Sequence, residues 1–217
     1  MNELLTFNFI GSLHNFNMQE LTKLSNFPNF SDQQLYDLDK AITEQIFQEN
    51  GFSTSIPITF EETMAMRDLV LAQNDDYIPL FTHWKEEGKI NDEQFQFLLL
   101  INSIFNNETE ADAISTELFG IQQSVSNSTT LTLDQKALVY NACSIGASSV
   151  LYWYSAYTND KNPWNQTKES NSGWIKRALL DLIGLTVGFL VGFEYGGWIG
   201  GAVLGVITAV ACSSEPK

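Results

Sequence analysis

The chain has 217 residues, a length that suits one or two small domains. Its 15 Phe, 7 Tyr and 5 Trp supply enough large apolar surface to exclude an intrinsically disordered chain. The formal net charge is -15. Such a charge repels phosphate backbones, which disfavours nucleic-acid binding, and it gives no electrostatic attraction to anionic lipid.

This charge is unevenly distributed along the chain. Of the 11 basic and 26 acidic side chains, three of each lie from Trp174 onward, so the last part of the chain is neutral. The first 173 residues hold the other 8 basic and 23 acidic side chains, and with them the whole net charge. We interpret the charge of this first part as a feature that keeps it soluble.

The first 30 residues show no clear periodicity, and we expect them to be irregular apart from a short helix at 18–24. Ser31 followed by Gln34 has the pattern of a capping box, in which each side chain bonds the backbone amide of the other residue. This pair predicts a helix from 32 to about 49, with Gly51 beyond its end.

Similar start signals recur along the chain. Thr59 with Glu62 and Thr132 with Gln135 have the capping-box pattern, and Asn91 is a further N-cap candidate. Helices are therefore expected at 59–73, 78–87, 92–106, 109–124 and 132–158. Because no stretch alternates convincingly between apolar and polar residues, the sequence predicts an all-α fold.

The helix expected to end near residue 158 is unusual, because residues 137–159 carry no charge. A membrane span is one interpretation of such a segment. Asn141 and several serines make it too polar for that, so we expect a central buried helix. Its small residues would let another helix approach closely.

Polar residues with Pro163 dominate the stretch 159–173, which we interpret as a linker. The sequence thus divides into an acidic helical domain at 1–158 and an apolar segment at 174–214. Between Leu182 and Ser214 this segment has a single charged residue, Glu194.

Glycines form a stripe in the apolar segment, where eight of the 14 glycines fall. One series with a spacing of four comprises Gly184, Gly188, Gly192, Gly196 and Gly200, and a second comprises Gly197, Gly201 and Gly205. Residues four apart lie on one helix face. Since glycine inside a helix costs up to about 1 kcal/mol relative to alanine, a repeated stripe indicates close helix packing.

The simplest arrangement is a helical hairpin, with one helix from Trp174 to about Phe193 and a second from about Trp198 to Cys212. One continuous helix is the alternative. We expect Gly188, Gly192 and Gly196 to lie against another helix backbone. That neighbour would be either the second half of the hairpin or the small-residue face around Ala142, Gly146 and Ser149.

The stripe from Gly184 to Gly200 resembles the glycine-zipper segments of bacterial proteins, including membrane-active bacteriocin-like peptides and envelope proteins. The resemblance covers about residues 184–205 and implies a packing mode rather than an activity. It is compatible with a buried hairpin in a soluble fold, with a dimerisation element and with insertion into a bilayer. The bacteriocin-like peptides are short and cationic, whereas this chain is long and acidic.

Catalytic and metal-binding patterns are weak. His83 precedes Glu86 and Glu87 at helical spacing, but the second histidine of a zinc-protease motif is missing, so we interpret it as a surface histidine. Cys143 and Cys212 match no metal or redox spacing; a buried free thiol is favoured at Cys143, and a disulfide between them is the alternative. We expect no catalytic, cofactor or metal site.

The function expected from the sequence is non-enzymatic: a secreted or envelope-associated bacterial protein that uses the hairpin at 174–214 for self-association, partner binding or membrane association. A membrane-inserting toxin with a soluble helical body is the first alternative, and a soluble enzyme is the second. The N-terminus has no signal-peptide pattern, so an extracellular location requires that a leader was removed.

Overall fold

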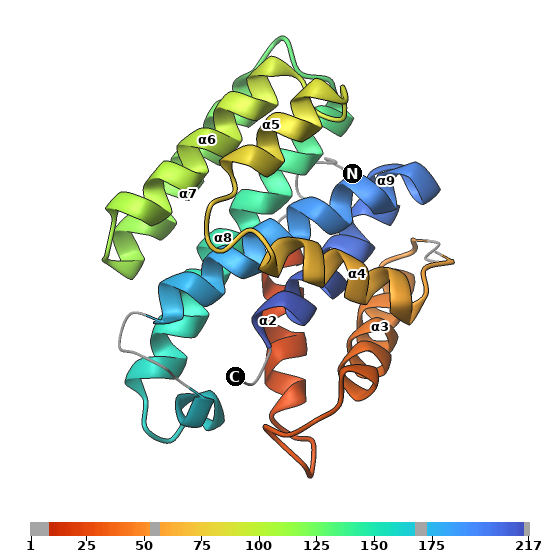
Figure 1. Ribbon diagram of the computed structural model, residues 1–217, viewed down its shortest axis with the longest axis vertical. Helices are drawn as coiled ribbons and strands as arrows, with labels where there is room; N and C mark the ends of the chain where they lie inside the picture. The colour runs from red at the N-terminus through yellow and green to blue at the C-terminus, as the bar shows by residue number, and fades with distance from the viewer. Residues whose placement is uncertain (1–8, 53–56, 168–172, 215–217) are drawn as a thin grey trace.

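The computed structural model describes residues 9–52, 57–167 and 173–214, and these residues form an all-helical fold without strands (Figure 1). The α-helices are α2 (Phe9–Leu21), α3 (Asp32–Glu49), α4 (Phe60–Leu71), α5 (Ile78–Glu86), α6 (Asp92–Asn107), α7 (Ala111–Asn127), α8 (Leu133–Thr158) and α9 (Gly173–Ser213). A 3₁₀ helix, η1 (Pro163–Thr167), lies in the expected linker, whose residues 168–172 are outside the described part.

The predicted helix starts are confirmed, because local side-chain chemistry sets them. Ser31, Thr59 and Thr132 each cap a helix and form a full capping box with the residue three positions later. Asn91 caps α6 in the same way, with Gln94 as its partner. These caps satisfy amides that the first helical turn leaves without intrahelical partners.

The expectation for the N-terminal 30 residues is wrong over 9–21; residues 25–30 are irregular as expected, and residues 1–8 lie outside the described part. Instead of an irregular segment with a helix at 18–24, residues 9–21 form α2, which packs one face against α8, α9 and α3 (Figure 1). Its buried residues recur at helical spacing: Ile10, Gly11, Leu13, His14, Asn17, Met18 and Leu21. The periodicity escapes a hydropathy pattern because glycine, histidine and asparagine occupy part of the buried face.

Helix α9 is a hairpin of two helical arms. The chain reverses at Gly196 and Gly197, whose φ angles are -152° and +58°. Only glycine adopts the backbone of Gly197 at little cost, because its ψ angle of -149° combines with the positive φ. The hairpin predicted from the sequence is therefore confirmed, and the continuous-helix alternative is excluded.

Glycines of the first arm lie directly against the second arm. A Cβ added to Gly192 would lie 2.3 Å from the carbonyl oxygen of Gly200. A Cβ added to Gly188 would lie 2.6 Å from the carbonyl oxygen of Leu204. At Gly184 it would lie 2.9 Å from the Thr208 carbonyl oxygen. The expectation that Gly188 and Gly192 pack against the second half of the hairpin is confirmed.

Glycines of the second arm show a similar but looser fit. An added Cβ at Gly201 would lie 2.9 Å from Phe189, and one at Gly205 would lie 3.0 Å from Leu185. Gly196 differs: an added Cβ there would meet no heavy atom within 4 Å. The expectation that Gly196 packs against a helix backbone is thus wrong, because the turn carries it away from the crossing.

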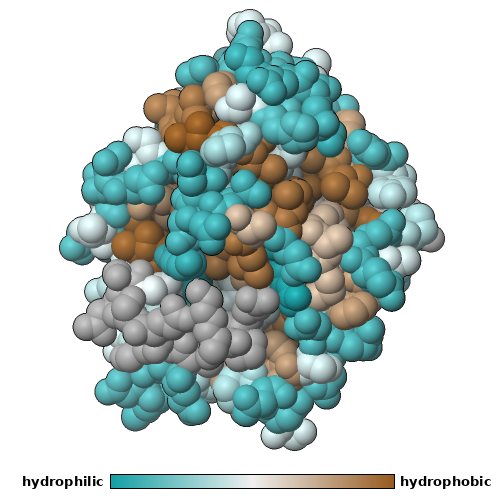
Figure 2. Space-filling view, in the orientation of Figure 1, coloured by the Kyte–Doolittle hydropathy of each residue, from teal (hydrophilic) through white to brown (hydrophobic). Residues whose placement is uncertain are grey.

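The hairpin lies among the other helices rather than beside them. It packs most extensively against α8 and α4, and also against α3 and α2, so that hairpin and body share one hydrophobic core. Helices α5, α6 and α7 lie on the outer side of α8 (Figure 1). On the face in Figure 2, hydrophilic side chains surround patches of apolar surface.

Helix α8 is the central buried helix that its uncharged sequence predicts. Its small residues let α2 approach closely, since an added Cβ at Gly11 would lie 2.5 Å from the carbonyl oxygen of Ser144. Gly146, on the same helix, lies against the side chain of Leu182 of the hairpin. Cys143 and Cys212 are both buried and are not joined to each other, so the disulfide alternative is excluded.

Candidate functional site: the apolar hairpin and the polar cluster at its base

The hairpin has a charged base and an exposed aromatic tip. By length and composition α9 is apolar enough to cross a membrane, and 72% of its most apolar stretch is buried in the fold. Glu194 and Tyr195 at the tip are exposed, and Trp198 is half-buried against Phe52. The arms between base and tip carry no charged side chain beyond Asp181.

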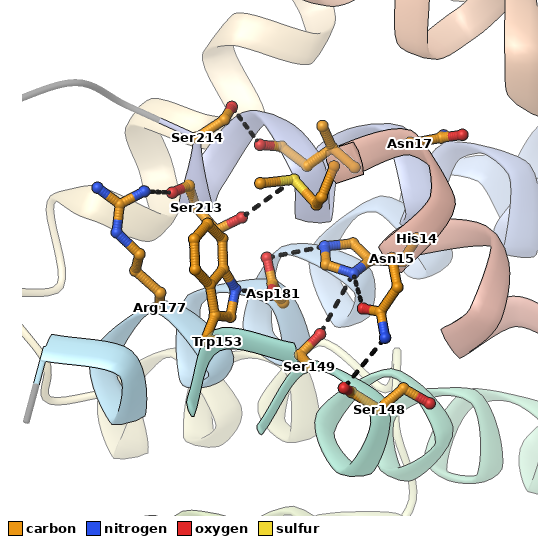
Figure 3. Close-up of polar contacts among 12 residues, drawn as sticks. His14, Asn15, Asn17, Ser148, Ser149, Trp153, Arg177, Asp181, Ser213 and Ser214 are labelled. Carbon is orange, nitrogen blue, oxygen red and sulfur yellow. Dashed lines mark hydrogen bonds and ion pairs between the residues drawn. The ribbon is translucent and has the colours of Figure 1, made fainter. Parts of the chain in front are cut away.

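A buried polar cluster joins the base of the hairpin to α2 and α8 (Figure 3). His14 Nε2 lies 3.0 Å from Asp181 Oδ1, and both side chains have zero exposure. The other carboxylate oxygen of Asp181 accepts a 2.7 Å hydrogen bond from the indole N–H of Trp153. On the far side of the imidazole, Nδ1 lies 3.3 Å from the hydroxyl of Ser149 and 3.1 Å from Asn15 Oδ1.

Arg177 lies one helical turn before Asp181 and is also buried. Its guanidinium lies 4.9 Å from the centroid of the Trp153 ring and 5.7 Å from that of Trp164. It also donates to the carbonyl oxygen of Ser213, at the end of the second arm. One cation thus holds both ends of the hairpin together, with the two indole rings beside it.

A second polar group lies about one helical turn further along the buried face of α2. Asn17 donates hydrogen bonds to Asp39 and to the hydroxyl of Thr43, the latter at 2.8 Å. Asp39 is only 2% exposed, and its Oδ2 has no hydrogen-bond partner among the described residues. Helix α2 therefore has a polar residue facing α9 and another facing α3, both inside the core.

These environments shift two pKa values upward. Burial raises the pKa of Asp39 to about 7, against the opposing effects of Asn17, His14 and Thr43. For His14, burial alone would lower the pKa, but the carboxylate of Asp181, together with Asn15 and Asp39, outweighs it, and the pKa of His14 is raised. His14 paired with Asp181 thus favours the imidazolium form.

Ser149, His14 and Asp181 have the residue types of a hydrolytic triad, but their setting does not support catalysis. All three side chains have zero exposure, so a substrate cannot reach the serine hydroxyl. Ser149 also lies in the middle of α8, where backbone amides are engaged within the helix and offer no oxyanion hole. The geometry supports a buried structural network.

Metal chemistry finds no support in the described residues either, since they contain no group of three or more His, Cys, Asp or Glu side chains able to hold an ion. His83, the histidine that the sequence singles out, is exposed and lies 3.2 Å from Glu87, which directly follows α5. This surface pair fits its interpretation as a surface histidine.

Sequence reasoning missed the whole polar cluster. Asp181 was visible as an acid at the edge of an apolar segment, and His14 as one of two histidines. Nothing in the local pattern linked them, because 167 positions separate the two residues and α2 was not expected. The predicted glycines other than Gly196 and Gly197, which form the turn, do come together along the crossing of the two arms.

Comparison of the chain with models of known protein families, with curated proteins and with solved structures found no match. The function must therefore be argued from the geometry of the hairpin and its surroundings.

The two raised pKa values predict that the protein is more stable at pH 5 than at pH 8. Asp39 holds its proton up to about pH 7 when folded but loses it near pH 3.8 when unfolded, so stability falls as the pH rises through that window. The stabilisation from His14 is fully present below pH 6.5 and is lost as the pH rises through its raised pKa. Denaturant unfolding at a series of pH values measures the effect, which should amount to a few kcal/mol at order of magnitude.

The matched control for this profile is Asp39→Asn, which keeps an oxygen that can accept from Asn17 but does not titrate. The free energy of unfolding of this variant should vary less with pH between about pH 4 and pH 7 than that of the wild type. A wild-type stability that rises from pH 5 to pH 8 would contradict the assignment. Glu87 and Glu93, whose pKa values are lowered, act in the opposite sense, but only at more acidic pH.

Proposed function

We propose that the chain is a non-enzymatic bacterial protein, secreted or associated with the cell envelope, whose C-terminal hairpin enters a lipid bilayer as a preformed antiparallel pair of helices. One observation carries the proposal. From Leu182 to Ser214 the single charged side chain is Glu194, at the exposed tip, so the rest of both arms can enter hydrocarbon without burying a charge.

The glycine geometry favours membrane association over self-assembly through the stripe. Gly184, Gly188 and Gly192 already contact the second arm, so they offer no free surface to another copy. In a bilayer, where the hydrophobic effect no longer holds two helices together, such close backbone packing keeps a hairpin intact. The glycine zipper would then serve the hairpin itself, both inside the fold and in lipid.

Aromatic residues at the tip fit the same proposal. Phe193, Tyr195 and Trp198 flank the turn, and Tyr195 is 50% exposed. Tryptophan and tyrosine favour the interface between water and hydrocarbon. The tip is thus the part of the hairpin that would touch a membrane first, before helices α2, α3, α4 and α8 release the arms.

The lengths of the arms favour an anchor over a pore. From Asp181 to Glu194 the first arm rises by about 20 Å, and the second arm, from Trp198 to Ser213, is about 24 Å long. The hydrocarbon core is about 30 Å thick. A single hairpin of this size can thin or enter a bilayer but does not by itself line a water-filled channel.

Vesicle flotation of the full chain tests the proposal. We expect it to float with phosphatidylcholine vesicles and to release no trapped dye. Its charge of -15 should weaken binding to phosphatidylglycerol vesicles at low salt. Flotation with dye release would favour the toxin alternative. Failure to float with either lipid would make the hairpin the core of a soluble protein and refute the proposal.

A matched pair of variants assigns the binding to the hairpin. Leu190→Asp places a charge on a half-buried position of the first arm, and charge at the centre of a membrane helix costs about 2.5–3.5 kcal/mol. It should abolish flotation. Leu100→Asp makes the same change at an exposed position of α6 and should leave flotation unchanged. Equal effects of the two substitutions would show that binding does not depend on the hairpin.

A further inference from the structure

A cavity of about 270 Å³ lies at the base of the hairpin, away from its tip. It opens between the segment at 71–77 that follows α4, the first turns of α9 and the last turn of α9. A cavity of about 150 Å³ is enough to hold benzene. This one therefore has room for a ring or a short chain together with one polar group.

The cavity is lined mostly by polar residues, and three of these carry a charge. Lys176 and Arg177 line it together with one acid, Asp75, so the described lining carries one net positive charge in a protein whose net charge is -15. Lys176 Nζ lies 2.9 Å from Asp75 Oδ2, and both side chains are about half exposed. Apolar contacts come from Leu71 and Leu180.

Tyr77 supplies the second observation. Its side chain is 99% buried and lines the cavity, yet its hydroxyl makes no hydrogen bond with the residues that the structure describes. Burial, followed by the charges of Asp75 and Cys212, raises the pKa of Tyr77, so the hydroxyl keeps its proton. Asp75 and Cys212 line the cavity together with Tyr77.

The loop that carries these groups has an uncommon backbone. Asn74 and Asp75 adopt φ angles of 51° and 69°, in the left-handed region that asparagine and aspartate tolerate better than most residues. This pair of left-handed residues brings the Asp75 carboxylate to Lys176 at the start of α9. This ion pair joins the loop to the first turns of α9, and both of its residues line the cavity.

We propose that this cavity binds a small organic monoanion, a carboxylate on an apolar body of about six to eight carbons. The carboxylate would accept hydrogen bonds from the Tyr77 hydroxyl and from Lys176, and the apolar body would lie between Leu71 and Leu180. One net positive charge in the lining favours a monoanion over a neutral molecule or a cation. The site is independent of membrane binding by the hairpin.

Calorimetric titration of the full chain with benzoate tests the proposal, with benzyl alcohol and benzylamine as neutral and cationic controls of similar size. Benzoate should bind, and the two controls should bind at least tenfold more weakly. Tyr77→Phe removes only the hydroxyl and should weaken benzoate about tenfold, as expected for a hydrogen bond to a charged group. Because that hydroxyl has no partner among the described residues, the melting temperature without ligand should stay unchanged.

Lys176→Gln should also weaken benzoate about tenfold, whereas Lys85→Gln, at a lysine paired with Asp92 elsewhere on the surface, should have no effect. Equal affinity of wild type, Tyr77→Phe and Lys176→Gln for benzoate would overturn the site, and so would tighter binding of benzylamine. Dodecanoate identifies the source of the ligand: tighter binding than benzoate indicates a lipid-derived chain, and weaker binding indicates a small water-soluble acid.

Discussion

Replacing Gly192 with alanine is expected to lower the free energy of unfolding by about 1–3 kcal/mol, because the new methyl group would overlap the backbone of the second arm. The added Cβ would lie 2.3 Å from the carbonyl oxygen of Gly200 and 2.8 Å from its carbonyl carbon. Backbone atoms cannot rotate away, so the two arms must separate. Denaturant midpoints of the variant and the wild type measure the loss.

The chain offers a graded series and a matched control for this substitution. Gly188→Ala should also destabilise, with its closest contact at 2.6 Å, and Gly205→Ala should destabilise less, at 3.0 Å. Gly120, exposed on α7, has no atom within 4 Å of an added Cβ. Gly120→Ala should therefore stabilise by about 0.4–1 kcal/mol through reduced unfolded-state entropy. If Gly188→Ala and Gly192→Ala both proved more stable than wild type, the close crossing would be refuted.

Replacing Asp181 with alanine is expected to cost about 3–5 kcal/mol, since breaking a buried ion pair leaves the other charge without compensation. Its loss removes the partner of His14 at 3.0 Å and the acceptor of the Trp153 indole N–H at 2.7 Å. The pKa of His14 should then fall, because burial acts without the opposing carboxylate. Chemical denaturation measures the stability, and NMR titration of the imidazole measures the pKa.

The exposed pair of His83 and Glu87 provides the control, because it also joins a histidine to a carboxylate, at 3.2 Å on the surface. Glu87→Ala should leave the stability nearly unchanged, as is usual for exposed ion pairs. A cost for Asp181→Ala as small as that of the surface control would show that the buried cluster adds little to the stability of the fold.

Helix boundaries were predictable wherever a local signal set them. Ser31, Thr59, Asn91 and Thr132 cap the helices that they predicted, because a capping side chain acts on amides only two or three residues away. The hairpin was predictable for a similar reason, since a spacing of four aligns glycines on one face without reference to the rest of the fold.

Features that depend on distant segments were not predictable. Helix α2 places His14 and Asn17 on its buried face, where their partners come from α9, α8 and α3. Burying polar groups is favourable only when such partners are present, and the sequence does not show which segments meet. The spacing of Gly196 matched the stripe, but the turn places this residue away from the contact between the two arms. The position of such a turn cannot be read from the spacing alone.

The position of the hairpin in the chain has a consequence for synthesis on the ribosome. Helix α2 packs against α9, and the hydroxyl of Ser213 lies 3.9 Å from the sulfur of Met18. At translation rates of 5–20 residues per second, roughly 10 to 40 s pass between the completion of α2 and that of the second arm. During that interval the early helices lack the segment that fills their core. We therefore expect the nascent chain to depend on chaperones, and the fold to form only after the second arm has left the exit tunnel.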